Sequence, residues 1–245
     1  MKNLLVLGAT SGIAQAYVNR VASQCESIVL VARSEEKLNL IAAHVSTISG
    51  AKVSTQIADL ADMANHEQLI SSIAGKVGSI DCALIAYGQL TDQERCSTDL
   101  DYAMEQFNLN GTSTVSLSMQ VADQMKKQGN GTLAVIGSVA GDRGRRSNYC
   151  YGAAKSAVES FLSGLRSDMQ QHKVNVLTIK PGFVDTPMTS SFKKGALWAS
   201  ADKVAGDIDS AVQKGKSVLY TPWFWRYIML IIKCIPEFIF KKLPL

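Results

Sequence analysis

Short apolar runs alternate with longer segments of mixed polarity from the N-terminus to about residue 221. The apolar runs are continuous, which is typical of parallel strands that helices cover on both faces. They predict strands over 4–7, 28–31, 52–57, 81–86, 132–136 and 174–179. Helices are expected from about 13, after the cap at 34, and over 62–76, 99–127 and 149–172. This alternation predicts one α/β domain over 1–221 with a doubly wound parallel β-sheet, which binds ligands at the carboxyl ends of its strands.

Residues 222–245 break this alternation and form the most apolar part of the chain. A membrane-spanning helix is excluded here, because Arg226 and Lys233 leave only 227–232 uninterrupted and a span needs ~20 apolar residues. We expect an amphipathic C-terminal tail in which Pro236 separates two short helices. Such a tail suits a membrane interface, a lid over the protein's own cleft or a contact with a partner subunit. On a continuous helix four of its charged residues share one narrow face: Arg226, Lys233, Glu237 and Lys241.

The composition is that of a globular protein and argues against several function classes. At 245 residues the chain suits one domain, and 47% hydrophobic with 19% charged residues is ordinary for a soluble fold. A net charge of +4 without any block of Lys or Arg argues against nucleic-acid binding. Five cysteines without C-x-x-C spacing and only three histidines argue against a metal site or a disulfide framework. With no signal-peptide pattern, we expect a cytoplasmic protein, at the inner face of the membrane if the tail binds lipid.

A glycine-rich turn follows the first expected strand, with the sequence Gly-Ala-Thr-Ser-Gly-Ile-Ala over 8–14. Glycines let a backbone approach phosphate groups, and the start of the next helix offers free N–H groups and positive potential. A glycine-rich turn alone is also compatible with a tight connection, but its place after a buried N-terminal strand favours a Rossmann-type dinucleotide site. The candidate phosphate-binding residues are Gly8, Thr10, Ser11, Gly12 and Ile13.

The choice of dinucleotide depends on the end of the second strand. NAD(H)-binding proteins usually place an acid there against the ribose 2′-hydroxyl, whereas this chain has Arg33 and no acid over 31–34. A guanidinium suits a 2′-phosphate through forked, charge-assisted hydrogen bonds. NADP(H) is therefore the preferred cofactor and NAD(H) the alternative, unless Arg33 is only a solvated side chain at the start of a helix.

Tyr151 and Lys155 stand four residues apart in an expected helix, so their side chains project from the same face. A free tyrosine has a pKa near 10, and a neighbouring ammonium favours the phenolate and lowers that pKa towards the working range. Ser138 follows the strand over 132–136 and offers a hydroxyl to a carbonyl oxygen. Alone, the Tyr–Lys pair suits a solvated surface contact. Together with the glycine-rich turn and the later Pro-Gly at 181–182, it indicates an active site.

These motifs, in this order, resemble those of the short-chain dehydrogenase/reductase family, and the resemblance covers about 2–221. The resemblance implies that Ser138 polarises a carbonyl group and that Tyr151 gives or takes the proton. It also implies that Lys155 tunes the tyrosine and holds the nicotinamide ribose. The other implied cofactor contacts, besides Tyr151 and Lys155, are Asp59, Leu60, Gly88, Pro181, Gly182, Val184 and Thr186.

Some of these assignments have alternatives. Asn108 matches the family asparagine that supports a water chain to the lysine, because it has the N-L-x-G context that its competitor Asn110 lacks. Either asparagine also suits a helix kink or cap. Asp59 equally suits a helix N-cap, and Thr186 an ordinary turn.

The chain departs from the family pattern at two places. Ala14 replaces the third glycine of the glycine-rich turn, which adds a methyl group where helix meets strand. Ile-Ala-Tyr-Gly over 85–88 stands where Asn-Asn-Ala-Gly is usual. Because those asparagines mostly brace the sheet beside the cofactor, we expect the change to affect local rigidity more than activity.

The loop over 141–146 lies at the expected substrate mouth and is rich in arginine. Guanidinium groups there suit a phosphate or another anion, although a solvated loop is equally compatible. The candidate substrate-binding residues are Arg143, Arg145 and Arg146. The segments 138–145, 147–149 and 242–245 resemble one branch of the family, the decaprenylphosphoryl-2-keto-pentose reductases. That resemblance implies a lipid-linked or phosphorylated keto-sugar as substrate.

The favoured function is an NADP(H)-dependent oxidoreductase that reduces a ketone or oxidises the corresponding alcohol. The alternative is a catalytically idle member that binds dinucleotide as a sensor or scaffold subunit. Intact catalytic candidates argue against this alternative: Ser138, Tyr151, Lys155 and Asn108. The family resemblance also implies a homodimer or homotetramer built through 99–127 and 149–172.

Overall fold

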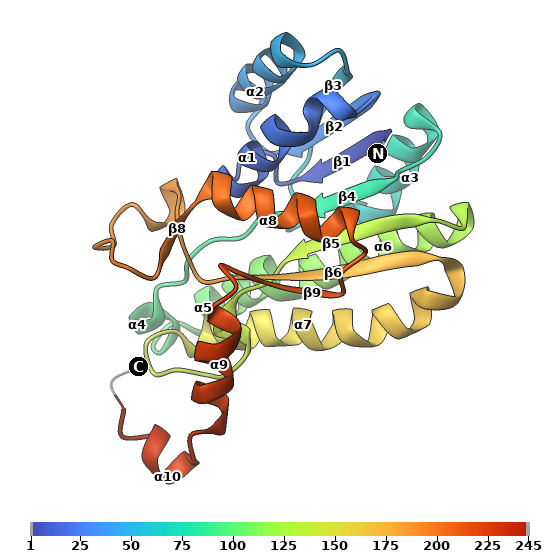
Figure 1. Ribbon diagram of the computed structural model, residues 1–245. Helices are drawn as coiled ribbons and strands as arrows, with labels where there is room; N and C mark the ends of the chain where they lie inside the picture. Colours follow the sequence, from blue (N-terminus) through green and yellow to red (C-terminus); the bar gives the residue numbers. More distant parts are fainter. Residues whose placement is uncertain (1, 244–245) are drawn as a thin grey trace.

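The computed structural model describes residues 2–243, and its centre is a seven-stranded parallel sheet (Figure 1). The strand order is β3-β2-β1-β4-β5-β6-β9, and neighbouring strands run parallel throughout. Two short strands, β7 (Phe183–Asp185) and β8 (Trp198–Ser200), form a separate parallel pair. The predicted doubly wound fold is confirmed. The strands of the main sheet are β1 (Asn3–Leu7), β2 (Ser27–Ala32), β3 (Lys52–Ile57), β4 (Cys82–Ile85), β5 (Gly131–Ile136), β6 (Val174–Pro181) and β9 (Val218–Thr221).

Two layers of helices cover the sheet, and the alternation of side chains along each strand divides the core between them. On β1, Leu4 and Val6 pack into one layer, whereas Leu5 and Leu7 pack into the other. The first layer consists of α1 (Gly12–Val21), α2 (Glu35–Ile48) and α8 (Ala201–Gln213). The second consists of α3 (His66–Val77), α6 (Ser113–Gln128) and α7 (Tyr149–Met169).

The strand order switches direction between β1 and β4. From β1 the chain builds outward to β3, then returns to β4 on the other side and continues to β9. Open α/β sheets bind ligands in the crevice at such a switch point, beyond the carboxyl ends of the strands. The connections that leave this edge include the glycine-rich turn, the loops after β2 and β3, the β4 loop with α4 (Gln93–Cys96), the β5 loop with a 3-10 turn over Val139–Gly141, and the loop after β6.

The long helix expected over 99–127 is interrupted. The helix α5 (Leu100–Phe107) is followed by a π-helical turn over Asn108–Thr112, and α6 continues from there. Asn110 and Gly111 are buried within this turn. A π-helical turn displaces the side chains that follow it around the helix axis, and such turns are frequent at functional sites.

The tail forms two short helices, α9 (Trp225–Cys234) and α10 (Glu237–Phe240), which are separated at Pro236 as expected. Trp225 and Met229 are buried against Val139 of the β5 loop, so α9 packs on the body of the protein. Within residues 2–243, no helix has the length and apolarity needed to cross a bilayer. Pro244 and Leu245, the end of the predicted tail, lie outside the described residues.

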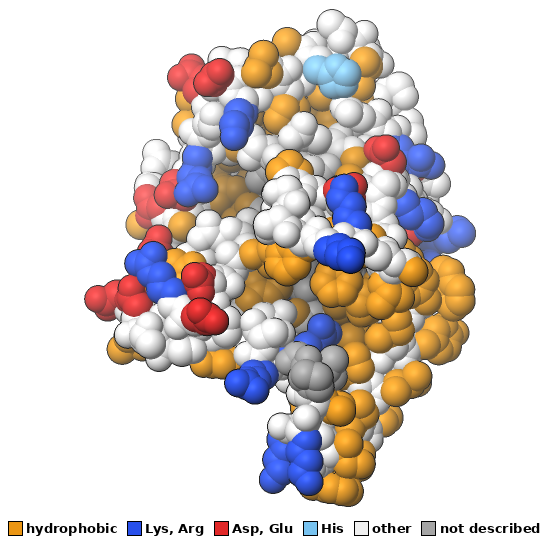
Figure 2. All heavy atoms as spheres, turned by 90° about the vertical axis from the view of Figure 1, so that its left-hand side faces the viewer, with side chains coloured by type: hydrophobic (Ala, Val, Ile, Leu, Met, Phe, Trp, Pro, Cys, Tyr) orange, Lys and Arg blue, Asp and Glu red, His pale blue; other side chains and the backbone are white. Residues whose placement is uncertain are grey.

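The other side of the tail is apolar and exposed. Figure 2 shows hydrophobic side chains gathered along the projecting end of the molecule, with Lys and Arg beside them. Tyr227, Leu230 and Ile231 lie on one face of α9, and Trp223, just before the helix, has its ring centre 5.9 Å from that of Tyr227. The large exposed apolar residues of the tail are Trp223, Tyr227, Leu230, Ile231, Phe238 and Ile239.

Candidate active site

The glycine-rich turn joins β1 to α1 and lines a cavity at the carboxyl edge of the sheet. Gly8 has a φ of 93°, a left-handed conformation that favours glycine. A Cβ at this position would lie 2.8 Å from both the Cβ and the N atom of Tyr87, so only glycine fits. The first turn of α1, from Gly12, lines the same cavity, and the N–H groups at a helix start suit a phosphate.

This cavity brings together most of the residues that the sequence predicted. It is lined by all predicted cofactor contacts and by three of the four catalytic candidates, Ser138, Tyr151 and Lys155. The predicted cofactor residues on its walls, besides Tyr151 and Lys155, are Gly8, Thr10, Ser11, Gly12, Ile13, Arg33, Asp59, Leu60, Gly88, Pro181, Gly182, Val184 and Thr186. In the described part of the chain, its lining does not include Asn108, Arg143 or Arg146.

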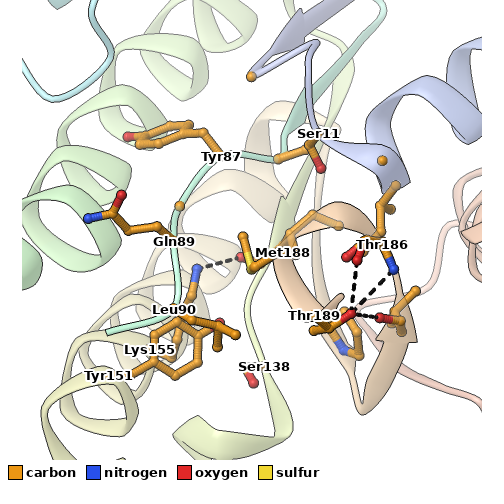
Figure 3. Close-up of a pocket in the computed structure, with 18 of the residues that line it drawn as sticks. Ser11, Tyr87, Gln89, Leu90, Ser138, Tyr151, Lys155, Thr186, Met188 and Thr189 are labelled. Carbon is orange, nitrogen blue, oxygen red and sulfur yellow. Dashed lines mark hydrogen bonds between the residues drawn. The ribbon is translucent and has the colours of Figure 1, made fainter. Parts of the chain in front are cut away.

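Thr186 packs against the start of α1 from the loop that follows β6. A Cβ at Gly12 would lie 3.2 Å from Thr186 Cγ2, so this loop approaches the glycine-rich turn closely. The loop is braced by Thr189, whose Oγ1 donates to the carbonyl of Val184 at 2.6 Å (Figure 3). Thr186 is therefore fixed at the edge of the cavity, in the place predicted for a cofactor contact.

Arg33 directly follows β2, lines the cavity and is exposed, so its guanidinium is accessible to a ligand. Asp59 follows β3 and accepts a hydrogen bond from the Ala61 N–H at 3.0 Å. The alternative of a helix cap does not apply to Asp59, because Asp62 caps the next helical turn by accepting from the Ala64 N–H at 3.2 Å.

Lys155 lies on α7 and is only 2% exposed. Its Nζ donates to the carbonyl of Ile136, at the end of β5, at 3.2 Å (Figure 3). Burial lowers the pKa of Lys155 to about 8, and the negative charge of Glu159 on the same helix opposes this shift. The ammonium form therefore persists at neutral pH.

Tyr151 stands one helical turn before Lys155, with the Lys155 Nζ 5.7 Å from the centre of its ring. Burial raises the pKa of Tyr151 to about 12, while the neighbouring Ser138 hydroxyl acts in the opposite direction. The expected lowering of this pKa by Lys155 is not found: burial is the main cause of the shift, and the ammonium is directed to the Ile136 carbonyl. The phenol is thus protonated at neutral pH, as a proton donor must be.

Ser138 begins the loop after β5, and Figure 3 shows it on the same side of the cavity as Tyr151 and Lys155. Its Oγ accepts a hydrogen bond from the Ala140 N–H at 3.1 Å and thereby caps the following 3-10 turn. The hydroxyl retains its own proton for donation to a carbonyl oxygen. The three groups form one wall at which a carbonyl can accept hydrogen bonds.

Asn108, the predicted fourth member of the site, is directed elsewhere. Its Nδ2 donates to the carbonyl of Ala61 at 3.1 Å, and its Oδ1 accepts from the Thr112 hydroxyl at 2.7 Å. Both partners lie outside the wall that Ser138 and Tyr151 form. The choice of Asn108 is therefore corrected by the structure.

Asn110 occupies the place predicted for Asn108. It is fully buried, and its Oδ1 accepts from the Gln89 N–H at 3.0 Å. A Cβ at Gly88 would lie 2.7 Å from Asn110 Oδ1 and 3.7 Å from Lys155 Nζ, so both groups meet at this glycine. The N-L-x-G context does not identify the asparagine of the site, because the π-helical turn directs the second asparagine, and not the first, towards the sheet.

The three arginines of the substrate loop have different environments. Arg143 is held by the tail: its Nη1 donates to the carbonyls of Ile232 and Ile235, both at 2.6 Å, and its Nη2 contacts Glu237 at 2.8 Å. Arg143 therefore caps the end of α9 and is not free for an anion. Arg146 is exposed, whereas Arg145 lines the cavity.

Three buried polar atoms around the cavity have no hydrogen-bond partner among residues 2–243: Arg145 Nε, Asn148 Oδ1 and Trp225 Nε1. Neither Asn148 nor Trp225 belongs to a motif that marks it as a site residue in the sequence. Trp225 packs directly on Gly182, where a Cβ would overlap its ring. No local pattern distinguishes this tryptophan from Trp223, because only the docking of α9 decides which of them enters the site.

The fold and the arrangement of the site are those of an oxidoreductase of the α/β class. Residues 2–196 match the family model for short chain dehydrogenase. The chain belongs to the short-chain dehydrogenase family, in agreement with the resemblance of its motifs.

The relatives extend this similarity over the whole chain. An uncharacterized oxidoreductase from Mycobacterium tuberculosis is 33% identical over 241 residues, which cover 98% of this chain and 96% of that protein. An uncharacterized oxidoreductase from Streptomyces coelicolor is 29% identical over 99% of this chain and 96% of its own length.

Two solved structures share the fold at low sequence identity. A short-chain dehydrogenase from Sphingobium yanoikuyae in complex with NADPH has a TM-score of 0.82, with 22% identity and 97% of both chains covered. An actinorhodin polyketide ketoreductase with NADPH has a TM-score of 0.80 with 19% identity, covering 91% of this chain and 97% of that chain.

Proposed function

We propose that this protein is an NADP(H)-dependent carbonyl reductase that uses Ser138, Tyr151 and Lys155 as its catalytic residues. The observation that carries the proposal is a protonated tyrosine, a serine hydroxyl and a buried ammonium on one wall of a cavity lined by a glycine-rich dinucleotide turn. The raised pKa of Tyr151 supports reduction, because a phenol that holds its proton at neutral pH serves as the general acid.

The residues present fit a dinucleotide. The left-handed Gly8 and the start of α1 would hold the pyrophosphate, and Lys155, on the wall of the same cavity, would hold the nicotinamide ribose. When bound, the cofactor supplies the hydride. Ser138 donates a hydrogen bond to the carbonyl oxygen of the substrate, and the Tyr151 O–H delivers the proton to that oxygen. Asn110 supports this end of the site by accepting a hydrogen bond from the Gln89 N–H, next to Gly88.

The preference for NADP(H) rests on Arg33. Arg33 follows the end of β2 and lines the cavity. Its guanidinium can donate two parallel hydrogen bonds to a 2′-phosphate. Two structures with the same fold are complexes with NADPH, which supports the same choice. NAD(H) is the weaker alternative because no acid over 31–34 is available to the ribose 2′-hydroxyl.

The proposed substrate is a lipid-linked or phosphorylated keto-sugar. An oxygen-rich substrate would satisfy the polar atoms that have no protein partner within the described chain, namely Arg145 Nε, Asn148 Oδ1 and Trp225 Nε1. The guanidinium of Arg145 suits an anionic group in particular. The apolar tail lies at the same end of the cavity, since Trp225 lines it, and offers a surface to a lipid chain.

Replacing Arg145 tests the anionic part of the substrate. We expect Arg145→Met to raise the KM for a phosphorylated keto-sugar by roughly 10- to 100-fold, because a charge-assisted hydrogen bond contributes about 1.5–3 kcal/mol. The KM for the unphosphorylated sugar should change little. Arg146→Met, at the exposed arginine outside the cavity, is the matched control. An equal rise for both sugars would contradict the assignment.

The exposed face of the tail is proposed to lie in the interface of an anionic membrane, which for a cytoplasmic protein is the inner face. Large apolar side chains contribute about 1.5–3 kcal/mol each when they leave water, and the basic residues beside them favour anionic lipids. We expect the combined Trp223→Ser, Tyr227→Ser and Ile231→Ser variant to lose at least about 100-fold in binding to phosphatidylglycerol vesicles, even if each side chain is only partly buried in the interface. Co-sedimentation measures this.

Two further points sharpen the vesicle experiment. A chain that ends near Tyr220 would also lack the buried Trp225 and Met229, so surface substitutions separate membrane binding from pocket integrity. The control is Leu40→Ser with Ile48→Ser, which removes exposed apolar residues from α2, away from the tail and from the proposed subunit interface. If the tail variant sediments with vesicles as strongly as the unchanged protein, the proposed membrane contact is wrong. The tail then serves only to pack against the body of the protein.

A homodimer or homotetramer through α5, α6 and α7 is also proposed. Exposed apolar residues on these helices support an interface there: Leu100, Met104 and Met119. Analytical ultracentrifugation of the purified protein tests it, and a monomer at micromolar concentration would contradict it.

Oxidation of NADPH on addition of a panel of ketones tests the central proposal. Turnover of any keto-sugar above the rate without enzyme supports a reductase. Binding of NADPH without turnover of any member of a broad panel would favour the alternative of an idle dinucleotide-binding subunit.

A further inference from the structure

A cluster of buried charges lies directly behind Ser138 and takes no part in the reaction as derived above. Lys180, the penultimate residue of β6, contacts Glu159 Oε2 at 2.7 Å and Asp142 Oδ1 at 2.5 Å. The side chains of Lys180, Asp142 and Glu159 are 12%, 3% and 9% exposed. Asp142 also accepts a hydrogen bond from the Tyr220 hydroxyl at 2.9 Å. Such burial is costly for charges unless each is paired, as here.

Glu159 connects this cluster to the catalytic serine. Its Oε1 accepts a hydrogen bond from the Ser138 backbone N–H at 3.2 Å. The chain around the carboxylate leaves no room for side chains: a Cβ at Gly137 would lie 2.9 Å from Glu159 Oε1, and a Cβ at Gly141 would lie 2.8 Å from it. The carboxylate therefore fills a pocket made by the backbone on both sides of Ser138.

Glu159 also acts on the catalytic lysine. Tyr151, Lys155 and Glu159 follow one another at intervals of four residues, so they form one stripe of α7 that faces β5 and β6. The stripe carries an acid, a cation and an anion in sequence. The negative charge of Glu159 opposes the effect of burial on the pKa of Lys155, and Lys180 balances that negative charge from the other side.

We propose that Glu159 is a positioning residue that holds the Ser138 peptide in place and keeps Lys155 in its ammonium form, with Lys180 as its counter-charge. The kinetic part of this inference rests on the proposed reductase function, whereas the structural part does not. Although burial alone would lower the pKa of Lys180, Glu159 and Asp142 together raise it, so the counter-charge stays on at neutral pH.

Three substitutions separate the two effects. Glu159→Gln keeps an oxygen for the Ser138 N–H but removes the charge. Glu159→Asp keeps the charge but withdraws the oxygen by one methylene group. Glu159→Ala removes both. Lys180 remains paired with Asp142 in all three, so no cation is left buried alone. The matched control is Glu67→Gln, an exposed glutamate on α3.

Hydrogen exchange of the Ser138 amide tests the hydrogen bond from the Ser138 N–H to the Glu159 carboxylate, and it needs no substrate. We expect protection to fall at least ~10-fold in Glu159→Asp and Glu159→Ala, and to persist in Glu159→Gln and in the control. Amides of β1 serve as the internal reference, because a general loss of stability would reduce their protection as well. Equal protection of Ser138 in all variants would overturn the proposed bond.

The pH dependence of kcat measures the effect of the Glu159 negative charge on the protonation of Lys155. The titratable and charged groups around Glu159 are Lys180, Asp142, Lys155 and Tyr151, with Tyr220 behind Asp142. In the unchanged protein the alkaline fall of kcat should follow Lys155, whose pKa is about 8. Without the carboxylate this pKa moves lower, so the fall should begin at lower pH in Glu159→Gln and Glu159→Ala but not in Glu159→Asp.

The outcomes remain distinguishable. We expect kcat at neutral pH to decrease about tenfold in Glu159→Gln, with the NADPH dissociation constant unchanged. A pH profile of Glu159→Gln that coincides with that of the control would contradict the proposal that Glu159 keeps Lys155 protonated.

If the unchanged protein reduces no ketone, the reductase proposal fails, while hydrogen exchange still decides whether Glu159 holds Ser138. Should Glu159→Ala not fold, the Gln and Asp variants carry the comparison, since both keep a polar side chain in the pocket.

Discussion

Tyr151→Phe is expected to reduce kcat by about 10²- to 10⁴-fold. The variant should bind NADPH nearly as well as the unchanged protein. The substitution removes only the hydroxyl that delivers the proton, and general acid catalysis contributes about that factor. The ring remains to fill its half-buried place beside Ser138 and Lys155. Steady-state kinetics with the best ketone of the panel and fluorescence titration with NADPH measure the two quantities.

Tyr149→Phe is the matched control, because it removes the same atom two residues away on the same helix. Tyr149 is exposed, and its hydroxyl meets the Ser97 hydroxyl at 2.7 Å outside the cavity. Its kcat should stay within about twofold of the unchanged value. Full activity of Tyr151→Phe, or equal losses in the two variants, would show that another group supplies the proton.

Arg33→Asp is expected to reverse the cofactor preference. A charge-assisted contact to the 2′-phosphate is lost and a like-charge contact replaces it, which together should cost NADPH binding about 3 kcal/mol, or roughly 100-fold. NADH should gain, because an acid at the end of the second strand suits the ribose 2′-hydroxyl. Dissociation constants for both dinucleotides measure the change.

The control for this substitution is Arg146→Asp, which alters the net charge equally at an exposed arginine outside the cavity. It should shift both dinucleotides by the same small factor, since only general attraction of anions is reduced. If the unchanged protein binds NADH and NADPH equally, Arg33 does not select the cofactor.

The sequence determined the parts of this protein that depend on local patterns. Continuous apolar runs indicated the strands around β1, because a strand that is buried on both faces cannot carry polar residues. The glycine-rich turn was readable because Gly8 must adopt a left-handed conformation against Tyr87. Tyr151 and Lys155 were readable because the helical period places residues four apart on one face.

The same four-residue spacing puts Glu159 one helical turn beyond Lys155. Its role depends on the partner with which it pairs, and no local sequence pattern shows that partner. Lys180 comes from β6 and reaches Glu159 only because β5 and β6 are neighbours and α7 packs across them. A charged residue just before Pro-Gly is equally compatible with a solvated position. Pairing between distant segments thus decided a role that spacing alone could not.

Tertiary packing likewise decided which of several similar residues enters the site. A π-helical turn brings Asn110, and not Asn108, to Gly88 beside Lys155. Arg143 is taken up by the carbonyl groups at the end of α9, whereas Arg145 faces the cavity. The sequence established the kinds of residue that the site contains. The choice among them followed from helix geometry and from the docking of the tail, because side-chain direction is set by contacts between segments far apart in the chain.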